Sequence, residues 1–177
     1  FQDSDPATND DMGGLKTFAL KQRVATMVKQ AGYPMVLNVV LHRGNIERVA
    51  DIIAMARDLD ADYLELANVQ FDGWAFRNKD LLLPSKQQVQ RAEQVVVEAR
   101  EESASPQLIY VVPDYWEGRP KACGGGWAKN MMLVAPDGLA LPCHGARKLP
   151  MPFPSVKDMS LDSIWRDHPS FGAFRGS

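Results

Sequence analysis

The sequence predicts an α/β protein whose first part is a parallel sheet covered by helices. Two observations lead to this prediction. Short apolar runs, each about the length of a strand, alternate with longer segments in which apolar residues recur at helical spacing. This order is typical of βαβ units, in which crossover helices pack on a parallel sheet. Both cysteines, many of the prolines and several tryptophans come after residue 113, so we place a domain boundary there.

The first elements follow from local patterns. Residues 1–14 are rich in Asp, Asn, Pro and Gly, which predicts a loop. A helix is expected over residues 15–30, where apolar residues recur at helical spacing before Gly32. Residues 35–41 are apolar nearly throughout, and such a run fits a parallel strand that is covered on both faces. Asn45 is expected to cap a second helix. Its expected buried positions are Ile46, Val49, Ala50, Ile53 and Met55 or Ala56.

The remaining elements of the first part repeat this order. Residues 63–67 are expected to form a second strand, and residues 108–112 a third. Between them, Ser85 and Gln88 have the spacing of a capping box. The helix that follows is expected to bury Val89, Ala92, Val96 and Ala99. A complete eight-unit barrel needs about 250 residues, so residues 1–112 fit the latter portion of a barrel.

The second part, residues 113–177, has shorter elements. Residues 131–134 and 139–141 flank the turn residues Pro136, Asp137 and Gly138, which predicts a β-hairpin. Ser160 is expected to cap one or two helical turns over residues 160–166.

Composition excludes several classes of protein. The formal net charge is −2 with no cluster of Lys and Arg, so the electrostatic signature of a nucleic-acid-binding protein is absent. No apolar run reaches about 18 residues, so we expect no membrane-spanning segment. Two cysteines are few for a secreted scaffold, and we expect a cytoplasmic protein. The chain opens on Phe1 without methionine, and we interpret it as a segment of a larger protein.

The two cysteines, Cys123 and Cys143, are spaced as Cys-x14-Gly-x4-Cys. Three glycines follow Cys123, and their backbone N–H groups can turn tightly toward a sulfur-rich ion. The Pro-Asp-Gly turn returns the chain toward Cys143. Two thiolates do not complete an iron–sulfur cluster, which normally takes four ligands. The alternatives are free thiols, a disulfide, or a zinc site in which His144 adds a third ligand.

An ordered set of segments extends this pattern along nearly the whole chain. They are FQDSDP, YPMVLNVVLHRGNI, LELANVQFDGWA, PDYWEGRPKACGGGW, PDGLALPCHGA and SLDSIWRDHPSFGAFRG. The set resembles the radical S-adenosylmethionine (SAM) enzymes of pyrroloquinoline quinone (PQQ) synthesis. The segment between the two cysteines resembles the start of their SPASM domain, a cysteine-rich extension that carries auxiliary clusters.

This resemblance implies a fold and an activity. Residues 1–112 would be the C-terminal part of a partial (β/α)6 radical SAM barrel, and residues 113–177 the N-terminal part of a SPASM domain. The implied enzyme joins a glutamate and a tyrosine of a small precursor peptide through a carbon–carbon bond. It uses SAM and a 4Fe–4S cluster, with auxiliary clusters bound through Cys123 and Cys143. The implied partners are the precursor peptide, a small peptide-carrier protein and an external reductant.

The chain departs from the family pattern in two places. It has no Cys-x3-Cys-x2-Cys motif for the radical cluster, and no cysteine follows Cys143. We therefore expect this chain by itself to bind no cluster and to be inactive. A half barrel also leaves an open strand edge, so we expect a dimer or a domain-swapped assembly. The alternative is a non-catalytic α/β module that binds a peptide or carrier protein and whose hairpin holds zinc or free thiols.

Several polar residues are candidates for binding SAM. Asn38 and Glu65 interrupt apolar strands, and we expect them to point into the barrel lumen. Gln2, Asp3, Asn68 and Gln70 are expected at the carboxyl ends of strands, where barrel active sites gather. The alternative for Asn38 is a hydrogen bond to a neighbouring backbone. For Gln2, Asp3, Asn68 and Gln70 it is a place in a loop or at a cap. His42 and Arg43 begin a strand-to-helix loop, and they are candidates for contact with a substrate carboxylate or simply part of a solvated loop. The four tryptophans are expected mainly as packing anchors: Trp74, Trp116, Trp127 and Trp165.

Overall fold

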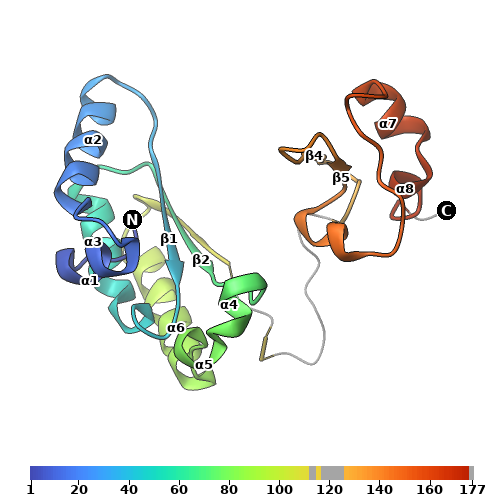
Figure 1. Ribbon diagram of the computed structural model, residues 1–177. Helices are drawn as coiled ribbons and strands as arrows, with labels where there is room; N and C mark the ends of the chain where they lie inside the picture. The colour runs from blue at the N-terminus through green and yellow to red at the C-terminus, as the bar shows by residue number, and fades with distance from the viewer. Residues whose placement is uncertain (112–114, 117–125, 176–177) are drawn as a thin grey trace. The chain divides into compact units, whose positions relative to one another are not determined.

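The computed structural model describes residues 1–111, 115–116 and 126–175, and the chain separates into two compact units (Figure 1). Unit 1 is Phe1–Trp116 and unit 2 is Glu117–Ser177. The sequence placed the boundary near residue 113. The assignment of the two parts to a barrel and a SPASM domain stays a prediction.

Unit 1 is built on a three-stranded parallel sheet in the order β1-β2-β3. The strands are β1 (Val36–Leu41), β2 (Tyr63–Asn68) and β3 (Gln107–Tyr110). Each strand pairs with the next one along the chain, and helical connections separate them. The α/β class and the parallel sheet that the sequence predicted are therefore confirmed.

The helices of unit 1 vary from a single turn to seventeen residues. They are α1 (Pro6–Gly13), α2 (Phe18–Gln30), the 3-10 turn η1 (Ile46–Arg48), α3 (Val49–Asp58), α4 (Gly73–Arg77), α5 (Lys79–Leu82) and α6 (Lys86–Glu102). The predicted capping box of α6 is present, with Ser85 and Gln88 each accepting a hydrogen bond from the other's backbone N–H. The four apolar positions predicted for α6 are all buried.

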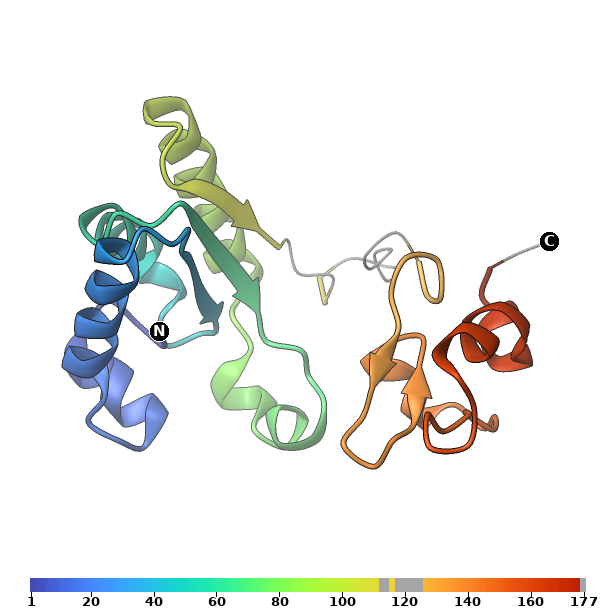
Figure 2. The ribbon, with the colours of Figure 1, turned by 90° about the horizontal axis from the view of Figure 1, so that it is seen from above.

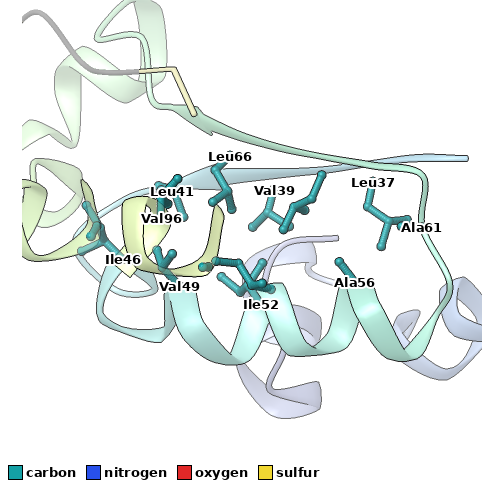
Figure 3. Close-up of a cluster of buried hydrophobic side chains, with 14 of the residues drawn as sticks. Leu37, Val39, Leu41, Ile46, Val49, Ile52, Ala56, Ala61, Leu66 and Val96 are labelled. Carbon is teal, nitrogen blue, oxygen red and sulfur yellow. The ribbon is translucent and has the colours of Figure 1, made fainter. Parts of the chain in front are cut away.

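The hydrophobic core lies on one face of the sheet. Leu37, Val39 and Leu41 of β1 point toward η1, α3 and α6, where they meet Ile52 and Val96 (Figure 3). Burial alternates strictly along β1, because successive side chains of a strand point to opposite faces. The expectation that this strand is covered on both faces is therefore wrong for unit 1. Figure 2 shows α2, α3 and α6 on one side of the sheet, while α4 and α5 lie beyond the end of β2.

Residues 1–14 are not a loop, because α1 forms within them. The Asp5 side chain accepts a hydrogen bond from the Thr8 N–H at 2.7 Å, and Pro6 occupies the first turn, where its missing N–H costs nothing. Gly14 ends the helix in the left-handed conformation, with φ of 66°. The cap, the proline and the terminal glycine are local signals for a helix, but the composition of the segment favoured the prediction of a loop.

The second predicted helix begins differently from the expectation. Asn45 precedes η1, but its side chain makes no capping hydrogen bond. The helical segment starts with a 3-10 turn, which has about three residues per turn. The buried positions of α3 are therefore displaced from those that a continuous α-helix would give. Ala50 is exposed, against the prediction, and Ile52 is fully buried in its place.

Unit 2 is a small unit with its own core. The expected hairpin is present as β4 (Leu133–Val134) and β5 (Ala140–Leu141), which pair antiparallel. The other elements are the 3-10 helix η2 (His144–Lys148), α7 (Leu161–Asp167) and α8 (Pro169–Gly172). Ser160 caps α7, as predicted. The buried centre of the unit consists of Ala128, Ala140, Ile164 and Phe171.

The N-terminal segment of unit 1 is fixed by a buried ion pair. The Asp3 side chain is fully buried, and Arg48 donates to both of its carboxylate oxygens, with Nε at 2.8 Å from Oδ1. The Asp5 N–H donates to the same Oδ1 at 2.9 Å. Within the described part of the chain, no helix has the length and apolarity needed to cross a bilayer.

We predict that Arg48→Met lowers the free energy of unfolding by about 3 kcal/mol, because it leaves the Asp3 carboxylate buried without a compensating charge. Arg91→Met is the matched control, since the pair of Arg91 with Glu47 is exposed, and it should cost less than about 1 kcal/mol. Urea unfolding followed by circular dichroism measures both. Equal losses in the two variants would show that the buried pair does not stabilise the segment.

Candidate functional site

The face of the sheet opposite the helices carries a polar pair. Asn38 of β1 lies directly opposite Glu65 of β2, and its Nδ2 donates a hydrogen bond to Glu65 Oε2 at 2.9 Å. Around the pair the face is apolar and uncovered, with Val36, Val40 and Tyr63 all exposed. The two strand residues that were predicted to face a lumen therefore lie together on one open surface.

This pair can bind a small polar molecule. A carboxylate accepts hydrogen bonds from hydroxyl and ammonium groups, and an amide offers both a donor and an acceptor. The hydrogen bond between them fixes the orientation of both side chains before anything binds. Because parallel strands bring their carboxyl ends to one edge, a molecule on this face also reaches the loops beyond that edge.

Gln2 and Asp3 lie beside the end of β1 but differ in accessibility. The N-terminal ammonium group of Phe1 donates to the carbonyl of Asn38 at 3.0 Å, which places this segment along β1. Gln2 is half-buried, and its carbonyl accepts a hydrogen bond from Asn45 Nδ2 at 2.9 Å. Asp3 is fully buried, and its carboxylate is paired with the Arg48 guanidinium. Gln2 thus remains a candidate binding residue by position, whereas Asp3 has a structural role.

Asn68 and Gln70 follow β2 and also differ. The Asn68 side chain donates to the carbonyl of Val111, and its Oδ1 accepts from the Tyr115 hydroxyl at 3.3 Å. Asn68 therefore joins the ends of β2 and β3. Gln70 is exposed at the carboxyl edge of the sheet. Its predicted role in cofactor binding, like those of Gln2, Asn38 and Glu65, stays a prediction.

His42 comes directly after β1 and is almost completely buried, with 5% of its surface exposed. Its Nδ1 accepts a hydrogen bond from the Gly44 N–H at 3.0 Å, which places the proton of the neutral ring on Nε2. Nε2 has no hydrogen-bond partner among the described residues. Burial lowers the pKa of His42, and the Arg48 guanidinium acts in the same direction, while the Asp3 carboxylate opposes them.

Arg43 makes contacts that the sequence did not suggest. Its backbone N–H and its guanidinium all donate to carbonyl oxygens at the end of the connection between β2 and α6. From the sequence, Arg43 was a candidate for contact with a substrate carboxylate, with a solvated loop as the alternative. In the structure it instead attaches a distant loop to the end of β1, and no local pattern could indicate a partner about forty positions away.

The four tryptophans have different environments. Trp116 donates from Nε1 to the carbonyl of Pro84 at 3.2 Å. In unit 2, Trp127 packs on Phe174, and Trp165 packs on Phe171. Trp74 is 76% exposed, with the Arg77 guanidinium 4.9 Å from its ring centroid. The prediction that tryptophans are mainly packing anchors therefore does not hold for Trp74.

The predicted cluster ligands are only partly within the described residues. Cys123 lies outside them. Cys143 is half-buried two residues after β5, immediately before η2 begins. Among the described residues, no group of three or more His, Cys, Asp or Glu side chains could hold a metal ion. The role of the two cysteines in binding iron stays a prediction.

A groove of about 580 Å³ lies elsewhere on unit 1. Its walls come from the N-terminal segment, α2 and α3, and include Asp5, Phe18, Arg48, Asp51 and Asp58. These residues lie on the helical side of the sheet, away from Asn38 and Glu65. Because the polar pair is on the uncovered face, the groove and the candidate site are separate.

Comparison with known proteins yields a likeness of fold. No family model matches the chain. A crystal structure of SuiB from Streptococcus suis aligns with 97% of this chain at a TM-score of 0.70 and 15% sequence identity. A second structure of SuiB, bound to S-adenosylmethionine, aligns with 86% of the chain at a TM-score of 0.63. The chain spans 43% and 38% of the lengths of these two chains, respectively. At this identity the likeness shows that the chain shares the fold of part of SuiB.

We predict that unit 1 loses stability as the pH falls below about 6.5, the ordinary pKa of histidine, and that His42 causes part of the loss. The unfolded chain takes up a proton at His42 more readily than the folded chain, whose pKa is lowered. Stability from this group is therefore complete above about pH 6.5 and declines toward the lowered pKa. His42→Asn keeps an acceptor for Gly44 and removes the titration.

The measurement is urea unfolding of the parent chain and of His42→Asn between about pH 7.5 and pH 5. The variant should lose less free energy of unfolding across this range than the parent does. His144→Asn makes the same change at an exposed position of unit 2 and is the control, since it lies outside the unit whose unfolding is measured. A slope that His42→Asn leaves unchanged would contradict the prediction.

Proposed function

We propose that the chain is part of a radical SAM enzyme that modifies a peptide. The observation that carries the proposal is the open sheet face with the Asn38–Glu65 pair, in a chain that shares its fold with part of a protein whose structure holds SAM. The ordered sequence motifs support the same function independently. The partial barrel of which unit 1 would be the latter part belongs to this proposal.

The residues of the open face fit SAM chemically. The Glu65 carboxylate can accept hydrogen bonds from the ribose hydroxyls or the ammonium group of SAM. The hydrogen bond from Asn38 keeps the Glu65 carboxylate in position. Val36 and Val40 on the same face offer apolar contact and keep water away from the bound molecule. In the mechanism these residues would bind SAM and orient it. Bound SAM, once reduced, supplies the radical chemistry that removes a hydrogen atom from a substrate.

The finer proposal is the cross-linking step of PQQ synthesis, as in a PQQ precursor peptide cyclase. One hydrogen atom leaves a glutamate side chain and another leaves a tyrosine ring of the precursor peptide, and a carbon–carbon bond forms between the two carbons. An external reductant supplies the electron that cleaves SAM, and the 5′-deoxyadenosyl part of SAM takes the hydrogen atom of the glutamate and leaves as 5′-deoxyadenosine. The tyrosine hydrogen leaves as a proton, and its electron passes to a one-electron acceptor such as an oxidised electron-transfer protein. The sequence motifs support this proposal, and a small carrier protein would deliver the peptide.

Iron–sulfur clusters are part of the proposal only through the cysteines. Cys123 and Cys143 would each provide a thiolate ligand to an auxiliary cluster of the intact protein. The described residues alone do not provide a complete ligand set for a cluster. The expected dimer or domain-swapped assembly of this chain and its cytoplasmic location also remain proposals.

The test uses the intact protein, reconstituted anaerobically with iron and sulfide. With SAM and a reductant it should release 5′-deoxyadenosine, and with a peptide that contains Glu and Tyr it should yield a product lighter by two hydrogen atoms. A reconstituted protein that binds iron but never cleaves SAM would overturn the enzyme proposal. Peptide binding without cleavage would favour the alternative, a non-catalytic binding module.

We predict that Glu65→Gln in the intact protein weakens SAM binding about tenfold, because a neutral amide forms weaker hydrogen bonds to hydroxyl and ammonium groups than a carboxylate does. Equilibrium dialysis with labelled SAM measures the dissociation constant directly. Glu101→Gln is the control, since it makes the same change at an exposed position near the end of α6 and should not alter binding. An unchanged constant in Glu65→Gln would remove the open face from the proposed SAM site.

We also predict that Cys143→Ser lowers the iron content of the intact reconstituted protein, because serine does not replace a thiolate in an auxiliary cluster. Iron analysis and absorbance of the charge-transfer bands measure the loss. Ser163→Ala is a control in the same unit that changes no predicted ligand. If Cys143→Ser retains the iron and absorbance of the parent, Cys143 is not a ligand.

A further inference from the structure

The connection between β2 and α6 is much longer than a strand–helix connection usually is. It covers residues 69–85, whereas such loops usually have about 2–6 residues. It contains the two short helices α4 and α5, which lie beyond the carboxyl end of β2 (Figure 1). Long ordered loops at this edge of a parallel sheet commonly serve binding. We refer to residues 69–84 as the ledge.

The ledge exposes large apolar side chains. Trp74, Phe76 and Leu81 are 76%, 64% and 73% exposed. All three come from α4 and α5, so they gather on a single short segment. These three lie within eight residues, and no other eight-residue stretch of the described residues holds three large apolar side chains that are each exposed by more than 60%. Apolar surface gathered in this way marks a contact site for another molecule.

Arg43 holds the ledge against the end of β1. Its backbone N–H donates to the carbonyl of Leu82 at 2.9 Å, its Nε to that of Leu83 at 2.8 Å, and its Nη1 to that of Asp80 at 2.6 Å. A cation that binds the last carbonyls of a helix also interacts favourably with the helix dipole. The three hydrogen bonds fix the end of α5 at one position relative to the sheet.

A second set of contacts joins the ledge to the end of β2. The ring of Phe71 packs against Tyr115 with a centroid distance of 5.4 Å, and the Tyr115 hydroxyl donates to Asn68 Oδ1. Trp116 donates to the carbonyl of Pro84 at the other end of the ledge. Both ends of the ledge are therefore attached to the carboxyl edge of the sheet that carries Asn38 and Glu65.

We propose that the ledge binds the peptide substrate and that Arg43 is the positioning residue that keeps it beside the site. This inference rests on the proposed function, because it names the place where the peptide of that reaction lies. The exposed aromatic rings of Trp74 and Phe76 suit aromatic and apolar side chains of an extended peptide, since such contacts need no precise hydrogen-bond geometry. Arg77, whose guanidinium lies over Trp74, adds a cation that can pair with a peptide carboxylate.

The first experiment measures binding and not turnover. The probe is a fluorescein-labelled synthetic peptide that contains Glu and Tyr with flanking apolar residues, titrated with the intact protein by fluorescence anisotropy. Trp74→Ala and Phe76→Ala should each weaken binding about tenfold, because each removes a large apolar contact. Their melting temperatures should stay close to that of the parent, since both side chains are exposed. Tyr33→Ala is the matched control: it removes an exposed aromatic ring ahead of β1, at the opposite edge of the sheet, and should leave binding unchanged.

The second experiment tests Arg43. Arg43→Gln should weaken peptide binding and should speed tryptic cleavage after Arg77 and Lys79, because the end of α5 is released. Arg43→Lys should recover part of the binding, since a lysine keeps the charge but cannot reproduce the fork of the guanidinium. In a Trp74→Ala background, Arg43→Gln should cost little further affinity, which shows that Arg43 acts through the ledge.

The outcomes separate this inference from the proposed function. Ledge variants that bind the peptide as well as the parent does, or a parent that binds no such peptide, would overturn the inference even if the parent cleaves SAM. Binding that depends on the ledge in a protein that never cleaves SAM would support the inference and overturn the enzyme. Equal losses from Arg43→Gln in the parent and in the Trp74→Ala background would overturn the positioning role.

Discussion

The pairing of β1 with β2 determines the arrangement of everything else in unit 1. In this register Asn38 lies opposite Glu65, and Leu37 lies opposite Leu64 on the buried face. Because side chains alternate along a strand, a slip of one residue would turn the polar pair into the core and expose the leucines. Exposing the leucines to water would cost free energy, so their burial keeps the Asn38 amide and the Glu65 carboxylate on the open face. The core of the unit and its candidate site depend on the same register.

Burial also explains why the two polar clusters of unit 1 differ in role. Asp3 and Asn45 are fully buried, and each has hydrogen-bond partners from within the unit, so they fasten the N-terminal segment to the end of β1. Asn38 and Glu65 satisfy each other on a surface that solvent or a ligand can reach. A polar side chain that is satisfied internally and enclosed stabilises the fold, whereas an accessible and oriented one can bind.

The sequence predicted what local chemistry controls. The capping box of α6 and the Ser160 cap of α7 involve residues three positions apart, and both are present. Alternation along β1 placed Asn38 on the face opposite Leu37. Asn45 fails as a cap because its Oδ1 accepts a hydrogen bond from the His42 N–H, while its Nδ2 donates to the carbonyls of Gln2 and Val40. Its contact with Gln2 and the Arg43 contacts with the ledge each span about forty positions. Partners of this kind depend on the tertiary fold, which a local pattern does not contain.

The contacts at the carboxyl edge suggest why the ledge is attached at both ends. A segment that exposes Trp74, Phe76 and Leu81 has little buried apolar surface of its own, so packing, such as that of Phe71 on Tyr115, does not hold it by itself. Backbone carbonyls bound by Arg43 and Trp116 provide the order that a core would otherwise supply. A pre-ordered apolar surface loses less conformational entropy when a peptide binds, and the affinity gained is correspondingly larger. Hydrogen bonds to the ledge backbone thus leave its side chains available for a ligand.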